Sequence, residues 1–245
     1  MPTRAALAAA LHPHGLHVRG GFCPQPEDGL YLADGSPAAV LWLVGNVGGS
    51  LWEAFSASAC ARDGLPHPLD RWSRQVGDAL AQQWGARALY PFSGPPEQPA
   101  YHPFQQWAAR CEAVYASPLM LRIHPQHGLW HAYRFALIFS QIDAADQAHL
   151  QAQHDQRQAQ NATQHQHSPC LHCVEQPCLT RCPAAAFDGR SFGVAACASH
   201  LRTPAGQRCM QGGCLARNAC PVAADLRYPE AQSAFHMAAF LRARG

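Results

Sequence analysis

The chain has 245 residues, of which 48% are hydrophobic and 14% charged, and its formal net charge is +2. This composition indicates a globular protein and excludes a disordered one. The near-neutral charge gives no electrostatic case for a nucleic-acid or membrane partner. No apolar run approaches the roughly 18 residues of a transmembrane helix, and we expect a cytoplasmic protein. All basic residues are arginine, which excludes Schiff-base lysine chemistry and a P-loop lysine.

Residues 1–142 are predicted to form an α+β domain. The continuous apolar run "AAVLWLVGNV" (38–47) is typical of a buried strand. Segment 67–85 predicts a helix, because a proline stands at its start, apolar residues recur at helical spacing and a glycine follows its end. Further elements are expected as a strand at 87–92, a helix at 104–116 and a strand at 130–140.

Residues 143–169 contain few large apolar side chains. This composition predicts an exposed helix in the first half and a polar linker in the second. At the other end of the chain, residues 229–245 are predicted to form a terminal helix that docks on a core. The segment between them, 170–228, is distinguished by its cysteines.

Eight of the eleven cysteines lie between positions 170 and 220, and they form two sets that each end in Cys-Pro. The first set is Cys170, Cys173, Cys178 and Cys182, and the second is Cys197, Cys209, Cys214 and Cys220. In a reducing compartment, this density of cysteine indicates metal rather than disulfides. Zinc is the main alternative to iron and sulfide, but zinc sites favour paired CxxC knuckles, and this block has one CxxC. Bacterial two-cluster ferredoxins use closely spaced cysteines that end in Cys-Pro.

The order of these cysteines, with "ACASHLRTPAG" and "CMQGGCLARNACP", resembles the dicluster domain of epoxyqueuosine reductases and reductive dehalogenases. The resemblance implies a small ferredoxin-like domain with two [4Fe-4S] clusters. It assigns one cluster to Cys170, Cys173, Cys178 and Cys220. It assigns the other to Cys182, Cys197, Cys209 and Cys214.

The stretch "LRIHPQHGLWHAYRFALIF" (121–139) resembles the "IHPxxGGWFxxR" strand of CblC-type cobalamin-processing proteins. That resemblance implies a modified nitroreductase fold for 1–142 and a bound cobalamin. The residues carried over as cobalamin-binding are His124, Gly128, Trp130 and Arg134. From the residues alone, Trp130 fits a core position equally well, and His124 fits a structural histidine.

Together the two resemblances predict a CblC-like domain that is fused to a dicluster ferredoxin domain and reduces a bound cobalamin. The expected partners are a corrinoid small molecule and a cellular electron donor, and no catalytic side chain is assigned. Two other functions stay open. One is an epoxyqueuosine-reductase-like enzyme that acts on an external substrate, and the other is a plain electron-transfer ferredoxin with a partner-docking domain.

Overall fold

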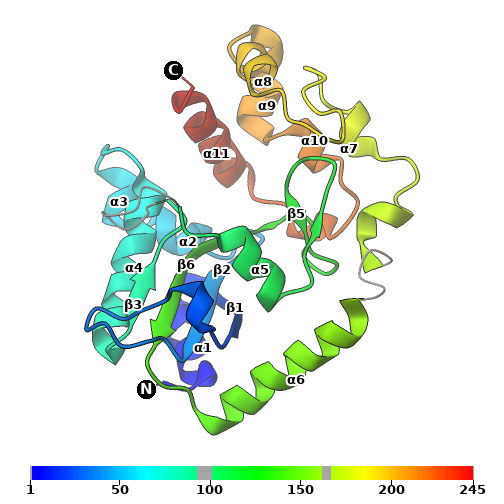
Figure 1. The fold of residues 1–245 in the computed structure, drawn as a ribbon. Coiled ribbons are helices and arrows are strands. Elements are labelled where there is room, and N and C mark those ends of the chain that lie inside the picture. The colour runs from blue at the N-terminus through cyan, green and yellow to red at the C-terminus, as the bar shows by residue number, and fades with distance from the viewer. Residues whose placement is uncertain (1, 93–100, 162–166, 245) are drawn as a thin grey trace. The chain divides into compact units, whose positions relative to one another are not determined.

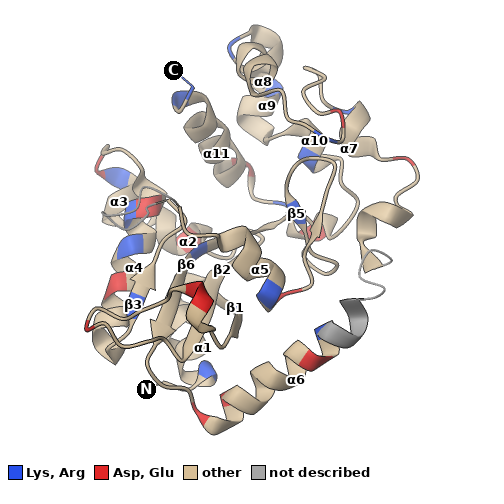
Figure 2. Cartoon of the chain, viewed as in Figure 1, with Lys and Arg blue, Asp and Glu red and all other residues tan. Residues whose placement is uncertain are grey.

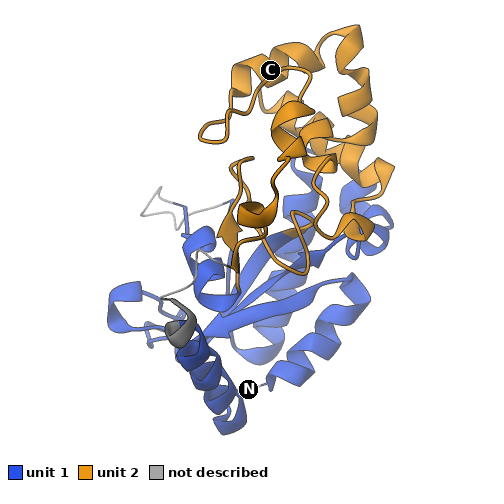
Figure 3. Ribbon diagram, turned by 90° about the vertical axis from the view of Figure 1, so that its right-hand side faces the viewer, with its two compact units in different colours: residues 1–112, 132–162 blue, residues 113–131, 163–245 orange. Residues whose placement is uncertain are grey.

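The computed structural model describes residues 2–92, 101–161 and 167–244, and it has an α+β fold (Figure 1). The chain divides into two compact units (Figure 3). Unit 1 comprises Met1–Glu112 and Ala132–Ala162, and unit 2 comprises Ala113–His131 and Thr163–Gly245. Within the described ranges, no helix is both long enough and apolar enough to cross a membrane.

Unit 1 is built on a sheet with strand order β1-β2-β6-β3. The strands are β1 (His17–Phe22), β2 (Val40–Val47), β6 (His131–Phe139) and β3 (Arg87–Leu89). The pairs β1–β2 and β3–β6 are antiparallel. The strands predicted at 38–47 and 130–140 are the two central ones, and most of their residues are buried. The strand predicted at 87–92 is present but ends at Leu89.

A β-bulge in β1 directs one arginine into the interior of unit 1. The register of β1 on β2 shifts between Val18 and Gly20, which leaves Arg19 as the extra residue. Its guanidinium donates to Glu112 from Nε at 2.7 Å and from NH2 at 2.6 Å. The two side chains are only 3% and 8% exposed. This buried ion pair joins β1 to the end of the helix that precedes Glu112.

The helices of unit 1 pack around the sheet, with α1 and α5 against β1 and α4 against β3. Their bounds are α1 (Arg4–Leu11), α2 (Trp52–Ser56), α3 (Ala59–Arg62), α4 (Pro68–Trp84), α5 (Phe104–Cys111) and α6 (Ala144–Asn161), with 3-10 turns η1 (His12–His14) and η2 (Pro26–Asp28). The helix predicted at 67–85 is confirmed as α4, and Gly85 ends it in the left-handed conformation. Basic and acidic residues are interspersed along α4 and α6 (Figure 2).

Two helix predictions differ from the structure in length. The helix predicted at 104–116 ends at Cys111, because Tyr115 and Ala116 pair with β5 as strand β4. Helix α6 continues to Asn161 and so includes the first residues of the predicted linker. Its ends are tied to unit 1, since Asp146 accepts from Arg4 N–H and Arg157 donates to the carbonyls that close α5. Residues 162–166 of the predicted linker lie outside the described residues.

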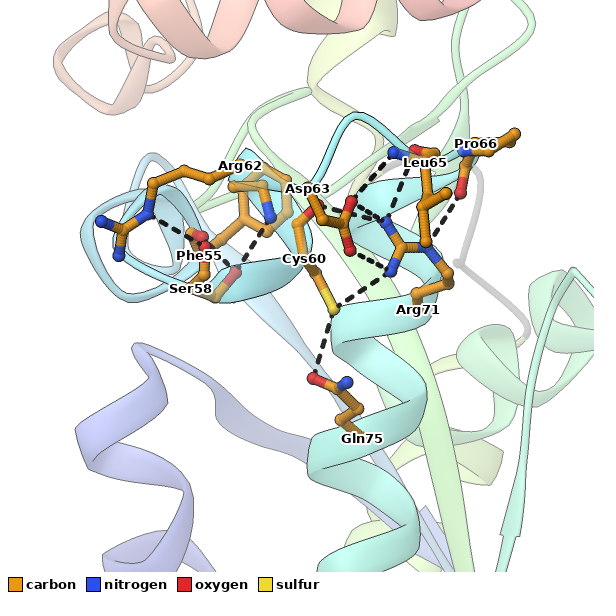
Figure 4. A network of polar contacts seen from close by, with 10 residues as sticks. Phe55, Ser58, Cys60, Arg62, Asp63, Leu65, Pro66, Arg71 and Gln75 are labelled. Carbon is orange, nitrogen blue, oxygen red and sulfur yellow. Dashed lines mark hydrogen bonds and ion pairs between the residues drawn. The ribbon is translucent and has the colours of Figure 1, made fainter.

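Polar contacts fix the corner between α3 and α4 (Figure 4). Arg71 forms a two-pronged ion pair with Asp63 at 2.6 and 2.7 Å, and it also donates to the carbonyl of Pro66. The thiol of Cys60 donates to Gln75 Oε1 at 3.2 Å. Cys60 is therefore part of a local structural network in unit 1.

Unit 2 contains a short hairpin and the whole cysteine-rich block. Its elements are β4 (Tyr115–Ala116), β5 (Arg122–Ile123), α7 (Pro177–Thr180), α8 (Val194–Leu201), α9 (Gln207–Gly212), α10 (Leu215–Asn218) and α11 (Glu230–Arg242), with 3-10 turns η4 (Pro169–His172), η5 (Pro204–Gly206) and η6 (Ala224–Leu226). The terminal helix predicted at 229–245 is α11. It packs against α9, and its buried residues are Gln232 and Ser233.

The boundary between the units differs from the predicted one at 142/143. Residues 113–131 belong to unit 2, because Leu119, Ile123 and Leu129 form a buried core with Ala216 and Cys220. Four further cysteines of the block pack against this core: Cys170, Cys178, Cys182 and Cys214. The hairpin thus supplies apolar side chains that pack against the cysteine loops. The spacing of the cysteines in the sequence did not predict this contact.

Candidate functional site

All eight cysteines of the block lie in unit 2 as free thiols. Short helices position them: Cys178 lies in α7, Cys197 in α8 and Cys209 in α9, while Cys214 precedes α10. Cys209 and Cys220 are buried and the other six are partly buried. Partly or fully buried thiols in one small unit are a donor set for soft metals.

Electrostatic coupling sorts these thiols into two groups of four. Burial, together with the neighbouring thiols of Cys220, Cys178 and Cys173, raises the pKa of Cys170 to about 11. Burial also raises the pKa of Cys178, to which Cys220 and Cys173 again contribute. We call these four residues quartet 1.

Quartet 2 consists of Cys182, Cys197, Cys209 and Cys214. Burial, together with the thiols of the other three, raises the pKa of Cys197 to about 11. The pKa of Cys214 is raised by burial as well, and Cys182 and Cys209 contribute. The two quartets coincide with the two ligand sets that the dicluster resemblance implies, including the exchange of the last cysteine of each sequence set.

Backbone N–H groups point at several of these sulfurs. Cys182 Sγ accepts from the N–H of Ala186 at 3.3 Å. N–H groups of Ala216 and Arg217 lower the pKa of Cys214, against the larger effect of burial, and that of Val222 does the same for Cys220. Hydrogen bonds to sulfur favour the thiolate, which is the form that binds metal.

The same turn follows the last cysteine of each sequence set. "CPAA" (182–185) and "CPVA" (220–223) both place an alanine in the left-handed conformation, with φ of 46° at Ala185 and 51° at Ala223. This conformation costs a non-glycine residue about 1–2 kcal/mol. Its repetition shows that one local structure is used twice. The two sequence sets share Cys-Pro-x-Ala, and the sequence prediction rested on the Cys-Pro part alone.

The arrangement of the thiols distinguishes a cluster from a single metal ion. Among residues 2–92, 101–161 and 167–244, no three His, Cys, Asp or Glu side chains are arranged to hold one metal ion. A cubane binds its thiolates through separate irons, so its ligands do not converge on one point. Two buried donors of unit 2, Arg217 Nε and Trp130 Nε1, have no acceptor in the described part of the chain. Four coupled thiols with spare N–H donors fit an iron–sulfur cluster.

Arg217 lies in α10, three residues after Cys214 and three before Cys220. Its guanidinium carbon is 4.7 Å from the ring centroid of Trp130 and 4.6 Å from that of Tyr228. One of its terminal nitrogens donates to the carbonyl of Leu129. The positive charges of Arg227 and Arg217 lower the pKa of Cys220, against the larger effect of burial. An arginine is thus held against two aromatic rings in the segment that joins Cys214 to Cys220.

Three of the residues predicted to bind cobalamin pack within unit 2. His124 Nδ1 accepts from the N–H groups of Gln126 and His127 at 3.0 and 3.2 Å, which closes a tight loop to Gly128. Gly128 has φ of +55°, and a Cβ there would lie 2.2 Å from the carbonyl oxygen of Val222. Trp130 is 1% exposed. In the structure, Gly128 thus packs against the Cys220 turn, His124 closes its own loop, and Trp130 is a buried residue of unit 2.

Arg134, the fourth of these residues, belongs to unit 1. It lies in β6 and donates from NH2 to Asp70 Oδ1 at 3.2 Å, in the first turn of α4. The structure thus brings His124, Gly128 and Trp130 together in one unit and places Arg134 in the other.

Comparison with known proteins finds no matching family model and no matching curated protein. The cluster and cobalamin assignments therefore remain predictions that rest on the residues, their geometry and the resemblances described above.

Proposed function

We propose that unit 2 is an electron-transfer domain that holds two [4Fe-4S] clusters and that the protein delivers electrons to a bound cobalamin. The observation that carries the first half is the division of eight thiols into two coupled quartets. When bound, such clusters supply one-electron transfer. The second half rests on the resemblance of residues 121–139 to a cobalamin-processing strand.

The residues of unit 2 have distinct roles under this proposal. The eight thiols ligate, and the backbone N–H groups at Cys182, Cys214 and Cys220 stabilise their thiolate form. The Leu119, Ile123 and Leu129 core packs against cysteines of both quartets and excludes water from that side. Since burial raises the pKa of the free thiols, metal binding releases protons.

In unit 1, Arg134 is the residue that we assign to the corrinoid. A guanidinium suits carboxamide, phosphate or carboxylate groups, because it presents several donors in a planar fork. Asp70 orients it from α4. Reduction of cobalt from Co(III) to Co(II) weakens the bond to the upper ligand, so the expected result of electron delivery is release of that ligand.

The test is an anaerobic reconstitution of the full chain with iron and sulfide. About eight irons per chain, a broad visible absorption and two reducible paramagnetic centres are expected. Cys23→Ser, in unit 1, serves as the matched control and should retain all the iron. Zinc bound in place of iron after aerobic and anaerobic purification would contradict the proposal.

Hydroxocobalamin is then added to the reconstituted protein. A shift of the corrin spectrum to the base-off form, followed by reduction through the clusters, supports the cobalamin half. Clusters without any corrin shift would refute that half and favour a plain electron-transfer module.

A further inference from the structure

We propose that the exposed side chains of residues 171–181 form the surface on which unit 2 docks its electron donor, and that this donor is an acidic one-electron carrier protein. This inference rests on the proposed function, because it assumes that the quartets hold clusters. It adds the place at which electrons enter unit 2 and the surface chemistry of the partner that brings them.

The two units carry charge of opposite sign, although the whole chain has a net charge of only +2. Unit 2 contains nine arginines and four acidic residues, a formal charge of +5, whereas unit 1 contains nine arginines and twelve acidic residues, a formal charge of −3. From α7 to α11, arginines recur and acidic residues are few (Figure 2). The unit that holds the eight thiols is therefore the basic one.

The arginines of unit 2 are not paired with carboxylates. Among the residues that the structure describes, none of them forms an ion pair with an Asp or Glu, and the ion pairs present all belong to unit 1. Seven of the nine are exposed, namely Arg181, Arg190, Arg202, Arg208, Arg227, Arg242 and Arg244. Unit 2 thus presents positive charge to solvent, where it can attract an acidic partner and raise the rate of encounter.

The segment from Cys170 to Cys182 combines this charge with exposed apolar side chains. Val174 is 95% exposed, more than any other large hydrophobic residue in the described ranges, and Leu171 is 62% exposed. Single apolar residues are common on protein surfaces. Here, however, both lie in a stretch of eleven residues that ends in the exposed Arg181. Apolar contacts beside charged ones are the usual composition of a protein–protein interface.

Chain connectivity places this surface next to the ligands of both quartets. Leu171 follows Cys170 and Val174 follows Cys173, two members of quartet 1, while Arg181 precedes Cys182 of quartet 2. Consecutive Cα atoms are about 3.8 Å apart. A protein that contacts these three side chains is therefore brought close to both clusters, as electron transfer requires.

RNA is the other large polyanion that a basic surface attracts, but residues 171–181 suit it less well. They contain no Phe, Tyr or Trp on which a base could stack. Exposed valine and leucine side chains favour an apolar protein contact over a phosphate backbone. An acidic carrier protein satisfies the charge, the apolar contacts and the position beside the ligands.

Charge compensation is the competing explanation for the arginines, because clusters and thiolates bring negative charge into unit 2. The two explanations differ in what an exposed arginine controls. Compensation acts on the reduction potentials of the clusters. Docking acts on a bimolecular rate constant, which falls as salt screens the attraction.

The experiment is anaerobic stopped-flow reduction of the reconstituted full chain by two donors, followed through the loss of cluster absorbance. One donor is a reduced plant-type ferredoxin, an acidic carrier with a potential near −400 mV. The other is the methyl viologen radical, a small cation. Each rate constant is measured at ionic strengths of about 0.01 M and about 0.5 M, which bracket weak and strong screening.

Three variants and a control separate the contributions. Arg181→Gln removes one charge at the surface, Arg181→Lys keeps it, and Val174→Ser removes the apolar contact. Arg242→Gln is the matched control, because it removes the same charge from an exposed position in the last turn of α11, 22 positions after the last ligand, Cys220. All the changed side chains are exposed, so the fold and the iron content should stay as in wild type.

In wild type, the rate constant with ferredoxin should fall at least tenfold from low to high salt, and that with viologen should not fall. Arg181→Gln should slow ferredoxin roughly three- to tenfold at low salt and little at high salt, and Arg181→Lys should restore most of the rate. Val174→Ser should slow ferredoxin at both salt concentrations. Arg242→Gln, the viologen rates and both cluster potentials should stay near wild type.

Three results would overturn the inference: ferredoxin reduction that salt does not slow, equal effects of Arg181→Gln and Arg242→Gln, or a shift of the cluster potentials that accounts for the slower Arg181→Gln reaction. Binding of an RNA duplex that Arg181→Gln weakens, with ferredoxin rates unchanged, would assign the surface to nucleic acid instead. Iron near eight per chain and reduction by viologen separate these outcomes from failure of the proposed function. A wild-type chain that assembles no clusters sinks both.

Discussion

Replacing Gly128 by alanine tests whether this glycine serves packing or ligand binding. Its φ of +55° alone costs an alanine about 1–2 kcal/mol. The added Cβ would lie 2.2 Å from the carbonyl oxygen of Val222 and 3.4 Å from the Cβ of Ala223, so the Cys220 turn would have to move. Overpacking of this kind costs roughly 1–3 kcal/mol. Gly128→Ala should therefore destabilise unit 2 by about 2–5 kcal/mol and impair cluster assembly at quartet 1.

Gly189→Ala is the matched control in the same unit. Gly189 also has a positive φ, of +86°, but its nearest contact would be Leu179 Cδ1 at an ordinary 3.5 Å. The difference between the two variants isolates the clash. Urea unfolding of the full chain, followed by circular dichroism and by loss of cluster absorbance, measures it through the midpoint and slope. Equal stabilities and equal iron contents, with cobalamin binding lost only in Gly128→Ala, would refute the packing explanation.

Three further predictions follow from the ligands, the buried ion pair and one carboxylate. Cys220→Ser should lose the same paramagnetic signal as any other quartet 1 variant, with iron falling to about four per chain, whereas Cys214→Ser should lose the other signal. Loss of the same signal in Cys220→Ser and Cys214→Ser would refute the grouping. Arg19→Met should cost about 3–5 kcal/mol in thermal or urea unfolding, because it leaves the Glu112 charge buried, and a second change of Glu112 to leucine should restore most of the loss. The hydroxyl of Ser191 and backbone N–H groups lower the pKa of Asp188 to about 2 from 3.8. The contribution of this carboxylate to stability is therefore complete above pH 3.8 and disappears as the pH falls toward 2. A carboxyl ¹³C titration with a midpoint near 4 would contradict this.

The elements that the sequence predicted well are those with a local cause. Segment 67–85 carries its own start, apolar stripe and glycine stop, and 38–47 is apolar throughout, so neither depends on distant residues. The helix expected at 104–116 failed at its second half, where pairing of β4 with β5 overrides helical spacing. The assignment of residues 113–131 to the N-terminal domain failed for the same kind of reason, since their apolar side chains pack against Ala216 and Cys220, about 90 residues further along the chain.

For the candidate site, spacing and Cys-Pro ends indicated the eight thiols, and the structure shows how they group. The contacts of Arg217 with Trp130 and Tyr228 could not be found from the sequence, because the three residues come from separate segments. Helical or loop periodicity cannot show such a contact. The motif at 123–134 is ambiguous in the sequence, because ligand binding and core packing both require a small residue and an aromatic residue there.

Substitution of Arg134 distinguishes ligand binding from packing as the explanation of this motif. Arg134 lies four positions after Trp130, yet it belongs to unit 1, where it forms an ion pair with Asp70. That ion pair is partly exposed, with side chains 13% and 32% accessible, so its loss should cost at most about 1 kcal/mol. Arg134→Gln should therefore leave the fold, the iron content and both cluster potentials near wild type.

The same variant should weaken the base-off shift of added hydroxocobalamin if unit 1 binds a corrinoid through this guanidinium. Arg87→Gln, in strand β3 of the same sheet, is the matched control and should bind as wild type does. An Arg134→Gln protein that binds and reduces cobalamin normally would remove Arg134 from the site. If Gly128→Ala then altered only stability and iron content, residues 123–130 would be explained by packing within unit 2, and the electron-transfer module would become the better account of the chain.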